Sequence, residues 1–175
     1  MTETEKKALD FATKAHGDQK RKYTGEPYIK HPIAVAKLVR EHAQTCHESM
    51  YCAALLHDTV EDTNATIDEI RREFGDIVTA FVDGLTDVSK PEDGNRAKRK
   101  EIDRQHLAKS LPPIQTIKLA DLIDNSKSIS EHDPEFAKVY MREKRLLLEV
   151  LVDGDKTLYA IAKKIVDDYF YGESK

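Results

Sequence analysis

The chain has 175 residues, of which 39% are apolar and 34% charged, and its formal net charge is −4. This length and composition predict one soluble domain, residues 1–175, with a hydrophobic core and charged outer faces. The negative charge argues against a general coat for nucleic acid, and no apolar run reaches the roughly 20 residues that span a bilayer. Two cysteines and an N-terminus without an apolar leader favour the cytoplasm.

Helical periodicity dominates the chain. Glycine (7) and proline (6) are too sparse for an all-β fold, which needs a turn about every ten residues. Thr66 and Glu69 fit a capping box at one helix start, and Gly75 fits a helix stop. The pattern predicts an all-α fold, with a helix opening at 31 and others over 4–16, 48–57, 65–75, 76–88, 96–109, 114–129, 135–151 and 156–170.

Two basic segments have two interpretations each. The loop over residues 18–30 carries Lys20, Arg21 and Lys22 beside two tyrosines, so it can hold phosphate oxygens and stack a base. A basic run this short is more often plain solvated surface. The helix over 96–109 is rich in lysine and arginine and poor in apolar residues, so it lies at the surface, either over a site or simply in solvent.

The stretch from His57 to Asp62 is the strongest functional signal. It follows a fully apolar run, residues 50–56, that has the character of a buried helix. Two metal-capable side chains, His57 and Asp58, are each followed four residues later by a carboxylate, Glu61 and Asp62. Ionisable groups this close to a core are costly without a partner, and a cation is the simplest compensation.

Two more side chains extend this set. His31 precedes a proline at a helix entrance, where its ring can point sideways into a site. Asp121 lies within an apolar helix and also needs a partner. His31, His57, Asp58 and Asp121 together form a candidate ligand set of a kind that suits Mn²⁺, Fe²⁺ or Zn²⁺ better than Mg²⁺ or Ca²⁺.

Such a site suits hydrolysis of phosphate esters. A bound metal ion can lower the pKa of water from about 15.7 to about 7. Glu61 and Asp62 would orient that water and transfer its proton, and the basic segments would neutralise a polyphosphate. Sequence spacing alone does not prove that these residues converge.

At this point the chain resembles the HD-domain superfamily of metal-dependent phosphohydrolases. More narrowly, it is similar to the hydrolase domain of RelA/SpoT proteins and to the single-domain small alarmone hydrolases. The similarity is carried by four blocks, which cover residues 21–32, residues 53–63, residues 73–75 with 82–86, and residues 118–121 with Asn125.

The resemblance implies a compact bundle of helices, about 8–10 of them, that binds one Mn²⁺ ion and removes the 3′-pyrophosphate from guanosine tetra- and pentaphosphate. Its implied metal ligands are His31, His57, Asp58 and Asp121, and its acidic catalytic pair is Glu61 and Asp62. The implied substrate contacts are Arg21, Lys22 and Asn125. The partner is a small nucleotide rather than a membrane or a nucleic acid polymer, and both a monomer and a homodimer remain open.

One departure from the family pattern concerns the substrate. The family commonly has Arg and His at the positions of Leu122 and Asp124, so this chain loses positive charge there. The adenosine analogue of the alarmone and the 2′-phosphate of NADPH therefore stay open as substrates. Another HD-type nucleotide hydrolysis and a catalytically silent binding module are further alternatives.

Overall fold

The computed structural model describes residues 1–172, a range that holds nine α-helices, one short 3₁₀ helix and no β-strand. The all-α prediction is confirmed. Across this range no helix combines the length and the apolar character that crossing a membrane requires. The chain divides into two compact units, residues 1–87 and residues from 88 onward.

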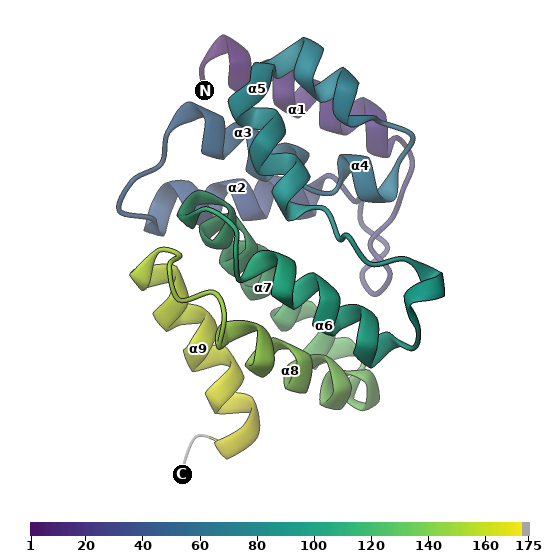
Figure 1. The fold of residues 1–175 in the computed structure, drawn as a ribbon, viewed down its shortest axis with the longest axis vertical. Coiled ribbons are helices and arrows are strands. Elements are labelled where there is room, and N and C mark those ends of the chain that lie inside the picture. Colours follow the sequence, from purple (N-terminus) through teal and green to yellow (C-terminus); the bar gives the residue numbers. More distant parts are fainter. Residues whose placement is uncertain (173–175) are drawn as a thin grey trace. The chain divides into compact units, whose positions relative to one another are not determined.

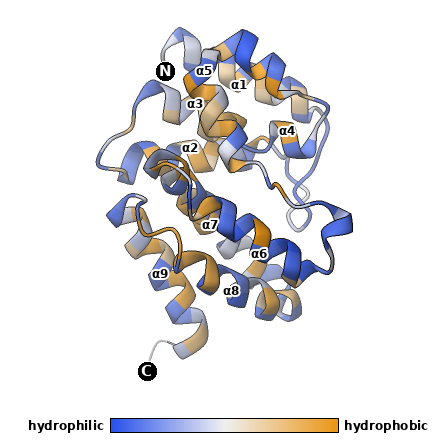
Figure 2. Cartoon of the chain, viewed as in Figure 1, coloured by the Kyte–Doolittle hydropathy of each residue, from blue (hydrophilic) through white to orange (hydrophobic). Residues whose placement is uncertain are grey.

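The first unit is built around α3. Its helices are α1 (Glu3–His16), α2 (Lys30–His42), α3 (Glu48–Leu56), α4 (Thr59–Asp62) and α5 (Ile67–Leu85) (Figure 1). Every residue from Met50 to Leu56 is buried, because α3 packs against α1, α2 and α5. A helix that is apolar around its whole circumference must be enclosed in this way, and Figure 2 shows α3 in mainly hydrophobic colours.

Local sequence signals determine where α5 begins and where it is interrupted. The Thr66 side chain accepts from the backbone N–H of Glu69, and the Glu69 carboxylate accepts from the Thr66 N–H, as the predicted capping box requires. Gly75 interrupts the helix with φ 79° and ψ 176°. Glycine adopts that backbone conformation readily. The break agrees with the two separate helices predicted on either side of Gly75.

Helix α2 begins one residue earlier than predicted, at Lys30. The preceding turn runs directly into the helix, because the N–H of Lys30 donates to Pro27 and that of His31 to Tyr28. Pro32 is tolerated in the first turn, where backbone N–H groups have no partner within the helix.

The second unit is organised by α7. Its elements are a 3₁₀ turn (Pro91–Asp93), α6 (Arg96–Leu107), α7 (Pro112–His132), α8 (Pro134–Leu148) and α9 (Lys156–Tyr171). Helix α7 packs against α8 and α9. Leu122, one of the two departures from the family pattern, is fully buried in α7. It therefore belongs to the core of this unit.

The loop between α8 and α9 lies directly on α7. The N–H of Asp153 donates to the Gln115 side chain at 3.0 Å, and that of Asp155 to the Thr116 hydroxyl at 2.9 Å. Gly154 lies between these two anchors. A Cβ atom there would come within 2.7 Å of Leu119 Cδ1 and 3.2 Å of the Gln115 backbone carbon. The absence of a side chain is what permits the close approach.

We expect Gly154→Ala to destabilise the protein by about 1–3 kcal/mol, because the added methyl group overpacks a contact with the backbone. For a chain of this size each kcal/mol lowers the melting temperature by about 2–4 °C. Thermal unfolding followed by circular dichroism measures the change. An unaltered melting temperature would contradict the steric argument.

Candidate metal centre

Three predicted metal ligands converge in the first unit. The ligand atoms of His31, His57 and Asp58 lie within 4.8 Å of one another. Asp58 Oδ2 is 3.0 Å from His57 Nε2 and 3.5 Å from His31 Nε2. The two imidazole rings are 5.2 Å apart and nearly perpendicular. Both histidines are at most 2% exposed, so the cluster is walled by protein.

The backbone around His57 sets the direction of its ring. His57 follows the last residue of α3, and its Nδ1 lies 2.8 Å from the carbonyl oxygen of Ala54. Since a carbonyl oxygen only accepts, Nδ1 carries the proton and Nε2 keeps its lone pair. This is the arrangement in which a histidine binds a metal ion, with its other nitrogen anchored to a backbone carbonyl.

The donor set fits a divalent transition metal. Two imidazole nitrogens and one carboxylate oxygen are typical of Mn²⁺, Fe²⁺ and Zn²⁺ sites, whereas Mg²⁺ and Ca²⁺ prefer oxygen ligands throughout. The fourth predicted ligand, Asp121, belongs to the second unit. Its participation stays a prediction.

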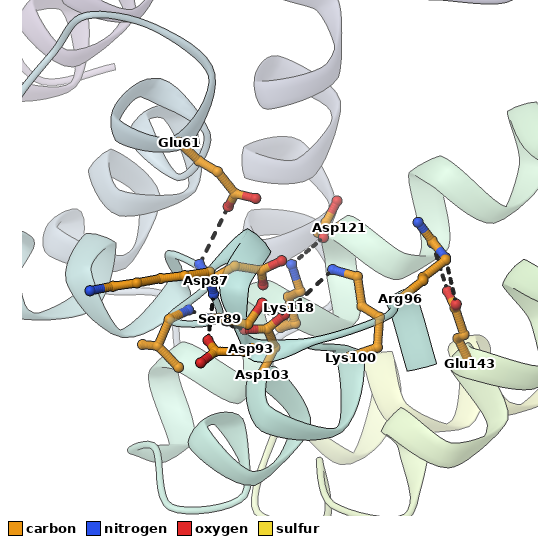
Figure 3. A network of polar contacts seen from close by, with 12 residues as sticks. Glu61, Asp87, Ser89, Asp93, Arg96, Lys100, Asp103, Lys118, Asp121 and Glu143 are labelled. Carbon is orange, nitrogen blue, oxygen red and sulfur yellow. Dashed lines mark hydrogen bonds and ion pairs between the residues drawn. The ribbon is translucent and has the colours of Figure 1, made fainter. Parts of the chain in front are cut away.

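The acidic pair, Glu61 and Asp62, lies on the short helix α4, which follows directly after His57 and Asp58. The chain turns at His57 and Asp58 and then resumes helical form, with the N–H of Asp62 donating to the Asp58 carbonyl at 2.9 Å. Glu61 and Asp62 are both exposed. Glu61 accepts a long contact, 3.5 Å, from the N–H of Asp87, which Figure 3 shows.

The pKa of Asp62 is raised above its ordinary value. The main cause is partial desolvation by the protein around its carboxyl group, and the second is the negative charge of Asp58. A hydrogen bond from Tyr28 and the charges of His16 and His57 act in the opposite direction.

The loop predicted over residues 18–30 spans residues 17–29 in the structure and is folded back on itself. Lys20 and Pro27 form an antiparallel bridge, and the N–H of Arg21 donates to the Glu26 carbonyl at 2.8 Å. Lys22 is exposed, and its ammonium group lies over the Tyr23 ring. Tyr28 leaves this loop toward the metal cluster and donates to Asp58 Oδ2 at 2.7 Å. The sequence alone predicts only base stacking for the tyrosines of this loop.

Asp121 and Asn125 lie together on α7 in the second unit. Asn125 Nδ2 donates to Asp121 Oδ1 at 2.6 Å, and Lys118 Nζ is 3.0 Å from Asp121 Oδ2. Figure 3 shows Lys118 directed at Asp121. The buried acid therefore has the partners that its position demanded. No role for Lys118 was predicted, although residues three apart on a helix share a face, so its spacing from Asp121 already indicated an ion pair.

Further positive charge surrounds Asp121. The pKa of Lys144 is lowered to about 8, mainly by burial and then by the nearby Lys118 ammonium group. On the basic helix α6, Arg96 forms two hydrogen bonds to Glu143, at 2.7 and 2.8 Å, and Arg104 pairs with Glu101. These two arginines therefore contribute to the structure of the unit.

Comparisons with known proteins agree with this description. A family model described as an HD domain matches residues 8–149. A protein of Aquifex aeolicus named guanosine-3′,5′-bis(diphosphate) 3′-pyrophosphohydrolase is 41% identical over 125 residues, which cover 70% of this chain but 17% of that protein. The human protein MESH1, of the same name, is 38% identical over 129 residues, which cover 73% of this chain and 70% of MESH1.

A solved structure gives a consistent result. It is described as a metazoan orthologue of SpoT that hydrolyses ppGpp and plays a role in starvation responses. The match has a TM-score of 0.88 at 26% sequence identity and covers 99% of this chain and 98% of that one. The prediction of an HD-domain fold is confirmed.

We expect Mn²⁺ to raise the melting temperature of the protein. A ligand at 100 times its Kd stabilises the native state by about 2.7 kcal/mol, which corresponds to about 5–10 °C here. His31→Gln removes one ligand and should abolish most of this shift. His42→Gln, an exposed histidine on the same helix, is the matched control and should keep it. Equal shifts in both variants would exclude His31 as a ligand.

Proposed function

Because the chain belongs to the HD-domain family of metal-dependent hydrolases, we propose that it is a guanosine-3′,5′-bis(diphosphate) 3′-pyrophosphohydrolase that uses one Mn²⁺ ion. The observation that carries the proposal is the cluster of His31, His57 and Asp58, with Asp62 one helical turn after Asp58. The names of the Aquifex and human relatives support this choice of substrate.

In this reaction one water molecule splits the bond between the ribose 3′ oxygen and phosphorus. A bound divalent ion would supply Lewis acidity and lower the pKa of water. Asp62 takes a proton from the attacking water as its oxygen bonds to phosphorus, and Glu61 orients that water. The 3′ oxygen leaves as a hydroxyl group after gaining a proton, so the products are GDP, or GTP from the pentaphosphate, and pyrophosphate.

The substrate carries several negative charges that need compensation. Arg21 and Lys22 lie on a loop that is closed by backbone hydrogen bonds, which limits the entropy lost when they bind phosphate. Arg21 can contact phosphate oxygens through two N–H groups at once. We assign Asn125 to the sugar or phosphate and Asp121 to the fourth ligand position, on the basis of their match to the family motif.

The same site suits other phosphorylated ribose compounds. At the two departures from the family motif, the buried Leu122 lies in the core and Asp124 is partly exposed. Neither side chain supplies the positive charge that the family commonly has at these positions. The identity of the base and the position of the phosphate on the ribose are therefore the substrate properties to test. We place the reaction in the cytoplasm, in agreement with the small nucleotide substrate.

A substrate panel on Mn²⁺-loaded protein tests the proposal. The panel contains guanosine and adenosine 3′-pyrophosphates, NADPH and 5′-nucleotides, and ion exchange separates the products. We expect pyrophosphate to be released from the guanosine compound. Preference for the adenosine compound or NADPH would keep the site but change the substrate. Mn²⁺ binding without any turnover would favour a silent binding module.

We expect Asp62→Asn to lower kcat by about 10²–10⁴-fold, because the amide cannot accept the proton. The affinity for Mn²⁺, measured by calorimetry, should be essentially unchanged. Asp76→Asn is the control, since that side chain is 92% exposed and pairs with the surface residue Arg71. Turnover near the wild-type value in Asp62→Asn would remove the acid–base role of this carboxylate.

A further inference from the structure

Tyr28 occupies a central position beside the metal cluster. Its ring packs against His16 on one side, with centroids 4.7 Å apart, and meets His31 edge-on at 5.8 Å. Its backbone is fixed as well, because its N–H donates to the Gln19 carbonyl at 2.8 Å and its carbonyl accepts from His31. The side chain therefore has little freedom to turn away from the cluster.

The Tyr28 hydroxyl group lies beside two carboxylates, those of Asp58 and Asp62. It donates to Asp58 Oδ2 at 2.7 Å, the same oxygen that faces the two histidine Nε2 atoms. The Asp62 carboxyl group lies close enough to the same hydroxyl group for each to shift the pKa of the other. A phenol has one proton to donate, and here that proton goes to Asp58.

His16 holds the Tyr28 ring from behind. It is 4% exposed, and its Nδ1 lies 2.8 Å from Gln19 Oε1. The amide oxygen only accepts, so Nδ1 is the donor. His16 Nε2 is buried and has no hydrogen-bond partner in the part of the chain that the structure describes. The contact of His16 with Tyr28 is therefore made by the face of its ring.

We propose that Tyr28 is a positioning residue of the metal centre, whose hydroxyl group holds Asp58 Oδ2 toward the histidines and orients Asp62, while His16 fixes its ring. The effect on turnover, through Asp62, rests on the proposed function. The effect on metal affinity, through Asp58, is independent of it. Hydrogen bonds to ligand carboxylates fix which oxygen faces the cation, and losing them typically costs 10–100-fold in metal affinity or activity.

The decisive variant is Tyr28→Phe, which keeps the ring and removes only the hydroxyl group. Titration of the protein with Mn²⁺ alone should give an affinity at least about 10-fold weaker than wild type. At saturating Mn²⁺, kcat for the guanosine 3′-pyrophosphate should also fall about 10-fold, with KM little changed, since Tyr28 acts through the two carboxylates.

Tyr159→Phe is the matched control. Its hydroxyl group also donates a hydrogen bond, at 3.2 Å, but to the backbone carbonyl of Leu148 and not to a predicted ligand. Unchanged Mn²⁺ affinity in Tyr28→Phe would overturn the proposal. Because the titration contains no nucleotide, its result stands even if the substrate panel shows no hydrolysis.

Two variants of His16 test the second half of the proposal. His16→Phe keeps an aromatic ring against Tyr28 and removes both imidazole nitrogens, with the hydrogen bond to Gln19, so Mn²⁺ affinity should stay near wild type if ring packing is what matters. His16→Ala removes the ring and should weaken Mn²⁺ binding as Tyr28→Phe does. Equal losses in both variants would mean that an imidazole nitrogen acts instead, and would overturn the ring-packing role.

Discussion

The hydrogen bond from His57 Nδ1 to the Ala54 carbonyl oxygen is the interaction on which the metal centre depends. It joins a metal-capable ring to the last turn of α3, the most enclosed helix of the first unit. Because every residue of α3 from Met50 onward is buried, that carbonyl is held rigidly, and so is the ring that donates to it. The Nε2 lone pair is consequently fixed toward Asp58. A cation bound there would offset the cost of burying these polar groups.

The end of α3 also determines where the acidic pair lies. The chain bends at His57 and Asp58 and then forms α4, so Asp62 follows the metal cluster by a single helical turn. The loop over residues 17–29 closes the other side and brings Tyr28 against Asp58, a residue 30 positions away in sequence. Asp58, Asp62 and the Tyr28 hydroxyl group that donates to Asp58 are thus brought together by two segments of one unit.

In the second unit, the buried carboxylate of Asp121 is also compensated by neighbouring side chains. A carboxylate within an apolar helix needs compensation, and Lys118 and Asn125 on the same helix provide it. Lysines near Asp121 depress one another's tendency to be protonated, as the lowered pKa of Lys144 indicates. Two lysines, Lys118 and Lys144, therefore place positive charge near Asp121, which suits binding of an anionic group.

The sequence by itself determined the helices, because their signals act within one or two turns: apolar periodicity, the Thr66 capping box and the break at Gly75. It also determined the candidate chemistry, since His57, Asp58 and the following carboxylates are neighbours in the chain. Only the tertiary structure decided which distant residues meet. His31 joins His57, Tyr28 donates to Asp58, and Gly154 lies against α7, because each contact depends on how helices pack. Packing sums many weak contacts over the whole core, and no short sequence pattern encodes that sum.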